Sequence, residues 1–314
     1  MIDFRYHIVS LVAVFLALAL GLFLGSTSLQ STVTHNLRQQ AHRVTADNQS
    51  LENQNDALKN ELSAEQKYVA DVEPYAVAGK LVDAGVAVVS APGVDDGDRT
   101  ALLNALSLAG ATVTADIRID AGYLDPDQDV ALGQLASQLA GAKPLPHASG
   151  AIQAATELAR ALVTRSGARI VSTKKVQLVL NTLSTGKMLS VHGDLPVRPA
   201  DLALLLVPLG TAPDGSPQAS QRDLGLIGLA RALRRGASGL VVAAPTLESG
   251  ANNGVIATMR ADSGFAKTIS TVDADDTAVG RVATVLALAA APAGTAGSFG
   301  ITQDPPLPSS SPPS

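Results

Sequence analysis

Two apolar runs that read as strands, residues 86–90 and 268–272, are each followed by closely spaced aspartates. The six aspartates are Asp95, Asp96, Asp98, Asp273, Asp275 and Asp276. If the two strands are neighbours, these carboxylates converge at one edge of a sheet and could bind a hard divalent cation. A simpler interpretation, which we favour, is that each group caps a helix or adds negative charge to its first turn. Both interpretations are kept, and the candidate ligands are Asp95, Asp96, Asp273 and Asp275.

Ligands for a soft metal ion are scarce in this chain. Such ions prefer thiolate, thioether or imidazole ligands, and the sequence has no cysteine, three methionines and five histidines. Met188 and His192 would adjoin each other on a helix, but residues 189–191 read as extended. These two residues are weak candidates for a metal site, and no cofactor can be assigned.

Motifs typical of enzymes are missing from the sequence. Residues 185–187 read Thr-Gly-Lys, as in a phosphate-binding loop, but Asn181 replaces the upstream glycine and Met188 replaces the serine or threonine. Residues 91–98 follow a strand, where doubly wound folds bind ligands, yet they lack the G-x-G-x-x-G spacing. No catalytic triad, paired catalytic carboxylates or H-E-x-x-H motif is recognisable. We therefore expect a protein without enzymatic activity.

Short apolar runs alternate with amphipathic ones through residues 74–300. Strands are expected at 86–90, 112–117, 202–207, 240–244 and 268–272. Helices are expected at about 98–109, 127–140, 150–165, 218–235, 251–261 and 276–290. This alternation predicts an α/β fold, a doubly wound and mostly parallel sheet covered on both faces, with a helical insertion at about 120–187. Residues 301–314, rich in proline and serine, are expected to be disordered.

A membrane helix is predicted near the N-terminus, after a short tail at residues 1–7. Residues 8–29 carry no charge and would span ~33 Å as a helix, enough for a bilayer core of ~30 Å. A cleaved signal peptide is the alternative, but Leu24 stands where the cleavage site requires a small residue. We expect an uncleaved anchor in the cytoplasmic membrane, with the N-terminus inside and the bulk of the chain on the extracytoplasmic side.

A heptad pattern follows over residues 30–73. Leucine or valine recurs at d positions every seven residues, and asparagine occupies two consecutive a positions. The expected interface residues are Leu37, Val44, Asn48, Leu51, Asn55, Leu58 and Leu62. A buried asparagine pairs best with its counterpart, so this pattern favours a parallel two-stranded coiled coil. The alternative is a single amphipathic helix that folds back on the following domain.

Composition argues against nucleic acid as a partner and indicates which residue types form the core. The net charge is −5 and no basic stripe is present, which argues against nucleic-acid binding. Aromatic residues make up only 3% of the chain, so alanine, valine and leucine must form most of the core. The heptads and the apolar segment make a second copy of the chain and the membrane the expected partners.

Several segments resemble one protein family. Residues 1–11 read MIDFRYHIVSL and residues 20–25 read LGLFLG. Four further segments are 108–114 (LAGATVT), 270–273 (STVD), 275–288 (DDTAVGRVATVLAL) and 297–300 (GSFG). In these segments the chain resembles the MctB family of mycobacterial-type copper transport proteins. The resemblance extends over essentially the whole chain up to the terminal proline and serine residues.

The resemblance implies a role in copper efflux through the cell envelope, with copper as the transported ion. The family is described as forming pores in the outer membrane, and it offers no catalytic motif. A related protein of the family is instead paired with a cytoplasmic-membrane partner and tied to the control of cell-wall hydrolysis at division. The resemblance thus implies a second membrane protein as a further partner of this chain.

The residues themselves give little support to a pore. One helix cannot enclose water, and the chain lacks the alternating strands of about ten residues that form a membrane barrel. Two functions therefore remain open: copper transport or homeostasis, and a dimeric coiled-coil scaffold or regulator that does not handle copper.

Overall fold

The computed structural model describes residues 4–140, 148–165, 171–193, 198–209, 217–246, 254–303 and 305–308. The chain divides into two compact units, Met1–Glu65 and Gln66–Ser314.

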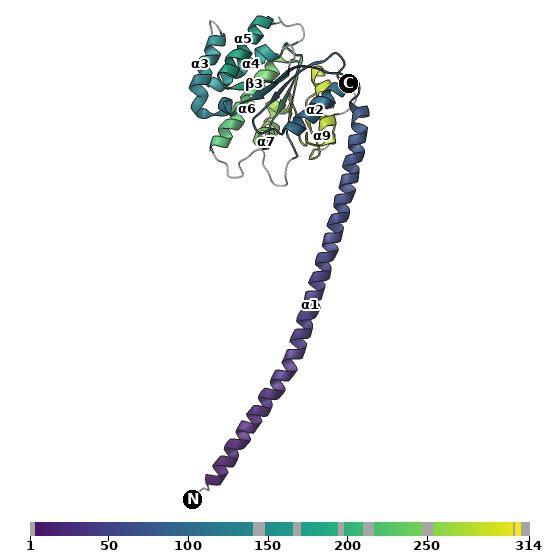
Figure 1. Cartoon of the computed structure of the whole chain (residues 1–314), viewed down its shortest axis with the longest axis vertical. Coiled ribbons are helices and arrows are strands. Elements are labelled where there is room, and N and C mark those ends of the chain that lie inside the picture. The colour runs from purple at the N-terminus through teal and green to yellow at the C-terminus, as the bar shows by residue number, and fades with distance from the viewer. Residues whose placement is uncertain are drawn as a thin grey trace. The chain divides into compact units, whose positions relative to one another are not determined.

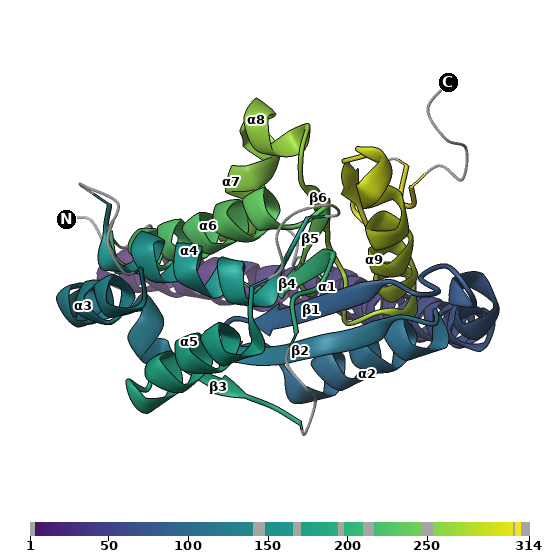
Figure 2. The same cartoon turned by 90° about the horizontal axis from the view of Figure 1, so that it is seen from above.

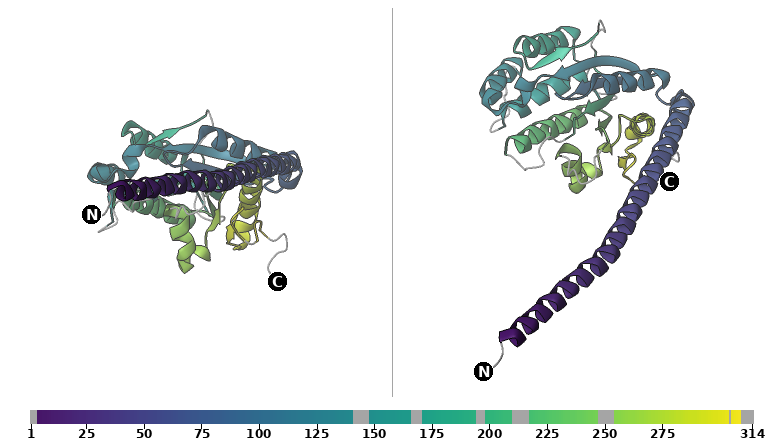
Figure 3. Two further views of the ribbon diagram at one scale, coloured as in Figure 1. Left: turned by 90° about the horizontal axis from the view of Figure 1, so that it is seen from below. Right: turned by 60° about the horizontal axis from the view of Figure 1, so that its bottom comes forward.

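The first helix, α1 (Phe4–Val77), contains both the membrane segment and the heptads in one continuous element (Figures 1 and 3). Its most apolar part is Tyr6–Gly25, with a mean hydropathy of 2.7 and no side chain buried. By length and composition it is the one helix in the described part of the chain that could cross a membrane. The apolar span includes residues 8–25 of the expected 8–29, and the side chains of residues 26–29 lie outside the described residues.

The heptad side chains of α1 lie on its surface within the single chain. Val44, Leu51, Leu58 and Leu62 are each more than half exposed. Asn48 and Asn55 are exposed as well. The Leu37 side chain lies outside the described residues. The coiled-coil dimer therefore stays a prediction.

The helix does not stop at Pro74, as the sequence suggested, but continues to Val77. Proline disfavours helix before it, because its ring crowds the preceding residue. Here Glu73 and Val77 are buried against the α/β unit, and Val77 is fully covered. Tertiary packing therefore stabilises about one further helical turn after Pro74, where the local effect of proline would end the helix.

The described strands form one seven-stranded sheet in the order β3-β2-β1-β4-β5-β6-β7. The strands are β1 (Gly85–Ser90), β2 (Thr112–Ile119), β3 (Leu189–Val191), β4 (Leu202–Leu206), β5 (Gly239–Ala243), β6 (Ser270–Val272) and β7 (Ser298–Phe299). All neighbours pair in parallel except β2 and β3, which are antiparallel. The predicted α/β class and mostly parallel sheet are confirmed.

Helices cover both faces of this sheet. They are α2 (Asp96–Leu108), α3 (Asp129–Ala140), α4 (Gly150–Leu162), α5 (Thr173–Thr185), α6 (Pro217–Gly236), α7 (Gly254–Ala261), α8 (Ser263–Ala266) and α9 (Ala278–Ala290), with short 3-10 turns η1 (Ala121–Leu124), η2 (Pro126–Gln128) and η3 (Ala291–Ala293). Figure 2 shows α2 on one side of the strands and α4 and α6 on the other.

The two cores follow from the alternation of side chains along each strand. In β4, Leu202, Leu204 and Leu206 join the core under α2 and α9, whereas Ala203 and Leu205 join the core under α4 and α6. Because both faces are covered, the strand reads as a continuous apolar run. The described residues of the expected insertion at 120–187 include α3, α4 and α5, and α4 packs against α3 and α6.

Details at the C-terminal side of the sheet differ from the sequence prediction. Strand β6 begins at Ser270, since Thr268 and Ile269 still hydrogen-bond back to the carbonyl of Phe265. The two-residue strand β7 was not predicted, because so short a run gives no periodic signal. The start of the expected helix at 251–253 lies outside the described residues.

The C-terminal segment packs on the domain for longer than expected. Leu307 lies against the core under α2 and α9, and Pro308 is buried. The backbone N–H of Gly300 donates to the carbonyl of Pro306 at 2.9 Å. The expectation of disorder throughout 301–314 is therefore wrong for 301–303 and 305–308.

Candidate functional site

The two aspartate groups follow strands that are not neighbours. Strands β4 and β5 lie between β1 and β6 in the sheet, so the condition for a shared metal site at adjacent strand ends is not met. Asp95 caps α2, because its side chain accepts from the N–H groups of Gly97 at 2.7 Å and Asp98 at 3.1 Å. The capping interpretation is confirmed for this loop.

Asp96 and Asp116 each form an ion pair with an arginine beside the loop that follows β1. Arg99, on α2, pairs with Asp116 of β2, and Arg118, also of β2, pairs with Asp96. Neither pair was foreseen, since each joins residues on different elements without a shared motif. Asp96, at the start of α2, therefore forms an ion pair with Arg118.

Asp273 is completely buried and takes part in a structural network. It accepts from the Arg260 guanidinium at 3.0 Å and from the hydroxyl and N–H of Thr302. Arg260 also donates to Thr271 and to the carbonyl of Phe299. This network joins α7, β6 and the C-terminal segment, and both carboxylate oxygens of Asp273 are used within it.

Ala274 separates two aspartates that have different surroundings. Its φ of 63° is left-handed, a conformation that non-glycine residues rarely adopt. Asp273 on one side is paired with an arginine, whereas Asp275 on the other side is buried with one oxygen lacking a hydrogen bond. Burial raises the pKa of Asp275 to about 7, with further contributions from Asp276 and Asp98 and an opposing one from Arg281.

Carboxylates that follow β1 and β6 nevertheless approach each other, through the packing of two helices and not through neighbouring strands. Asp98 lies on α2 and Asp276 directly precedes α9, and these two helices pack together. Burial raises the pKa of Asp98, and Asp95 and Asp276 raise it further. Thr277, and not Asp276, caps α9, while Asp276 accepts two hydrogen bonds from Thr246.

The described residues contain no group of three or more histidine, aspartate or glutamate side chains placed to hold a metal ion. Met188 and His192 flank β3, and Met188 is buried. The His192 N–H donates to the carbonyl of Asp116 at 2.8 Å, and its ring Nδ1 makes no hydrogen bond. Met188 and His192 are four positions apart along extended chain, roughly 13 Å, so they do not form one site.

One interaction fastens the end of α1 to the α/β unit. The guanidinium of Arg281, on α9, donates to both carboxylate oxygens of Glu73 at 2.9 Å and 2.7 Å. This bidentate geometry is the strongest form of such a pair. The two residues are 208 positions apart, and no local signal in the sequence connects them.

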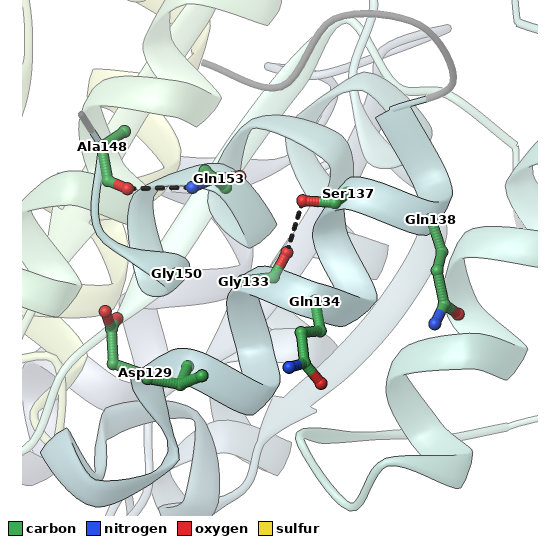
Figure 4. A pocket seen from close by; sticks show the side chains of 9 residues that line it. Asp129, Gly133, Gln134, Ser137, Gln138, Ala148, Gly150 and Gln153 are labelled. Carbon is green, nitrogen blue, oxygen red and sulfur yellow. Dashed lines mark hydrogen bonds between the residues drawn. The ribbon is translucent and has the colours of Figure 1, made fainter. Parts of the chain in front are cut away.

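A polar pocket of about 510 Å³ lies between α3 and α4 (Figure 4). The two helices approach closely at Gly133 and Gly150. A Cβ atom added at Gly133 would lie only 3.3 Å from the Cα of Gly150, so glycine at this position permits the close approach. Ser137 donates back to the Gly133 carbonyl, while the amides of Gln134 and Gln138 lie along the pocket. Its lining suits hydrogen bonding to a neutral polar molecule and includes no nucleophile paired with a base.

Comparison with known proteins identifies the family. The profile of the family described as "Copper transport outer membrane protein, MctB" matches residues 1–306. The chain belongs to the MctB family. Relatives named "Copper transporter MctB" from Mycobacterium bovis and from two strains of Mycobacterium tuberculosis are 29% identical to it over 299 residues. The aligned region covers 92% of this chain and 92% of each relative.

The MctB-family match confirms the resemblance drawn from the opening residues and the segments around α9. It covers both the apolar helix and the α/β unit.

Proposed function

We propose that this chain is a membrane-anchored cell-envelope protein of copper transport or copper homeostasis, with copper as its transported ion. The family match over residues 1–306 carries this proposal, together with relatives named as copper transporters. The family description places such proteins in the outer membrane. The uncovered apolar span Tyr6–Gly25 supports anchoring.

The anchor would leave the N-terminal tail inside and the α/β unit on the extracytoplasmic side, because a short tail is more easily retained than a large domain. A single span does not enclose a water-filled path. A transport role would therefore depend on assembly of several copies or on a second membrane protein. Neither nucleic-acid binding nor a catalytic step is part of the proposal.

The test is total cell-associated copper in a deletion strain grown under copper load, compared with the parent and with a complemented strain. Copper should accumulate in the deletion strain and return to the parental level on complementation. Complementation with Met188→Ala plus His192→Ala then tests whether these two candidate ligands contribute. Equal copper in deletion and parent strains would contradict the transport role.

A second candidate function is a dimeric scaffold or regulator that binds a membrane partner and controls cell-wall hydrolysis at division. The observation in its favour is the exposure of Val44, Leu51 and Leu58, which recur every seven residues and are 54%, 61% and 65% exposed. A regular apolar seam left open to water is typical of a helix that requires a partner helix.

The absence of cysteine from the chain allows a direct test of this seam. Leu51→Cys at a d position should form a disulfide-linked dimer in membranes, because facing d residues in a parallel dimer come within disulfide range. Asn53→Cys, two positions away at an outward f position, is the matched control and should remain monomeric. Equal cross-linking of both variants would contradict the proposed seam.

The two functions are separated by substitutions that affect only one of them. Asn48→Leu with Asn55→Leu should change register or oligomeric state without removing a metal ligand. If this variant loses function while Met188→Ala plus His192→Ala keeps it, the scaffold is favoured. The reverse pattern favours direct copper handling.

A further inference from the structure

A small cavity of about 220 Å³ lies at the carboxyl ends of β1 and β2. Its walls include Ser90, Arg99, Arg118 and Asp120, and the loop that follows β1 closes one side. We propose that this cavity binds a small oxyanion, a phosphate or carboxylate group, through Arg99, Arg118 and Ser90. The inference is independent of the copper and scaffold functions.

Three polar atoms around this cavity have no hydrogen-bond partner in the protein. They are Ser90 Oγ, Arg99 Nε and Arg118 Nε. Ser90 is 2% exposed and Arg99 is 9% exposed. An unsatisfied buried donor costs about 1–3 kcal/mol, so native proteins rarely leave several together. A polar occupant is therefore expected, and the oxygens of an oxyanion are suitable acceptors for guanidinium and hydroxyl donors.

The two guanidinium groups are held in place by carboxylates that do not use their Nε atoms. Arg99 pairs through Nη1 with Asp116, and Arg118 pairs through Nη2 with Asp96. Arg99 Nε is 3.9 Å from Asp96, too far for a hydrogen bond. Donors that are fixed before binding lose less conformational entropy when a ligand arrives. Hydrogen bonds from a guanidinium to an oxyanion are among the stronger ones in proteins.

The location agrees with the general behaviour of doubly wound folds, which bind ligands outside the carboxyl ends of their strands near the point where strand order reverses. Here the order reverses between β1 and β4, and the loop after β1 forms part of the cavity wall. Gly93 in this loop has a φ of +91°, a conformation that favours glycine. A side chain at Gly93 would lie 3.5 Å from Pro208, which follows β4.

Size and charge limit what the cavity can bind. Its volume equals that of about seven water molecules at ~30 Å³ each, which is enough for phosphate or acetate. It is smaller than the usual pockets for larger ligands, which exceed ~300 Å³. Asp96 and Asp116 balance the two arginines, and Asp120 adds a negative charge at the wall. Binding is therefore expected to be weak and to improve when Asp120 loses its charge.

The experiment titrates inorganic phosphate, and separately acetate, into the full-length protein in detergent and follows binding by calorimetry. Arg118→Gln should weaken phosphate binding about tenfold or more, since it removes a charge-assisted hydrogen bond. Ser90→Ala, a milder change that removes only a hydroxyl, should weaken it several-fold. Asp120→Asn should strengthen it. Arg222→Gln, an exposed arginine on α6, is the matched control and should leave it unchanged.

Thermal unfolding of each variant shows whether the fold is retained, and Ser90→Ala keeps the test valid if Arg118→Gln unfolds. Acetate binding with the same variant pattern would identify carboxylates as further ligands of the same site. The proposal is overturned if neither anion binds the wild type, which would mean that water fills the cavity. It is also overturned if Ser90→Ala and Arg222→Gln bind phosphate equally, or if Asp120→Asn weakens binding.

Discussion

Leucines in the two units of this protein have opposite environments. Leu51 and Leu58 in the heptads of α1 are more than half exposed, whereas Leu204 in β4 is completely buried between two layers of helices. The α/β unit supplies its own partners for its apolar side chains. The helix of the N-terminal unit presents apolar residues that its own chain leaves uncovered, first over Tyr6–Gly25 and then at seven-residue intervals. The proposed anchor and the proposed helix pairing would cover these residues with lipid and with another helix.

Charged residues differ between the units in the same way. Lys59 and Asp56 on α1 lie 3.9 Å apart with both side chains largely exposed, an arrangement that contributes little stability. In the α/β unit, Asp273 is fully buried and paired with Arg260. Removing one partner of such a pair leaves an uncompensated buried charge, which is strongly destabilising.

The largest expected effect breaks this buried pair. Asp273→Ala should lower the free energy of unfolding of the α/β unit by about 3–5 kcal/mol, because Arg260 loses its carboxylate partner. Urea unfolding of the full chain in detergent, followed by pulse proteolysis, measures the change. Asp127→Ala removes an exposed aspartate and should be nearly neutral. Equal unfolding midpoints for the two variants would contradict the assigned role of Asp273.

The second prediction applies the same substitution to both units. Leu204→Ala should destabilise the α/β unit by about 2–5 kcal/mol, since it removes buried methyl groups and leaves a cavity. Leu51→Ala should leave the unfolding of that unit unchanged and should instead weaken chain association, measured by cross-linking in membranes. If Leu51→Ala destabilised the α/β unit as strongly, the helix would be folded back on the domain.

The third prediction concerns the apolar span. Leu18→Arg should reduce the fraction of protein retained in carbonate-washed membranes, because an arginine at the centre of a span costs about 2.5–3.5 kcal/mol on insertion scales. Leu51→Arg, outside the span, serves as the control and should stay in the membrane fraction. Full membrane retention of Leu18→Arg would argue against Tyr6–Gly25 as the anchor.

The last prediction concerns pH dependence. Burial, together with Asp276 and Asp98, raises the pKa of Asp275 to about 7. The folded state keeps the Asp275 carboxyl protonated up to about pH 7, whereas the unfolded state loses this proton near pH 4. The free energy of unfolding is therefore largest below about pH 4 and falls as the pH rises toward 7. The decline is about 1.4 kcal/mol per pH unit over that window.

Asp275→Asn should remove this decline and should be more stable than the wild type above pH 7. Urea unfolding at several pH values between 4 and 8 measures both curves. Asp127→Asn provides the control, with an unchanged slope. Parallel curves for the wild type and Asp275→Asn would show that this carboxyl is not responsible.

Parts of the candidate site followed from local sequence and parts did not. A helix cap was predicted within the group Asp95, Asp96 and Asp98, and Asp95 provides it, because an aspartate at the start of a helix can reach the N–H groups two and three residues ahead. The sequence offered convergence of the two aspartate groups only as an alternative that required neighbouring strands, whereas the approach of Asp98 to Asp275 arises from the packing of α2 against α9. The pairs of Arg99 and Arg118 were missed, since nothing in the spacing of these residues indicates their partners.

The sequence by itself determined the features that repeat locally. Twenty or so apolar residues define a span, a seven-residue repeat defines a helical seam, and alternating apolar runs define the strands and helices of an α/β fold. These signals depend on neighbours within a few residues along the chain.

Only the tertiary structure decided which distant groups meet. It pairs Glu73 with Arg281, 208 positions away, at the end of α1 where the helix continues beyond Pro74. It also brings Arg99, Arg118 and Ser90 together around one cavity. Such contacts depend on strand order and helix packing, and pairs so far apart in the chain leave no periodic trace in the sequence.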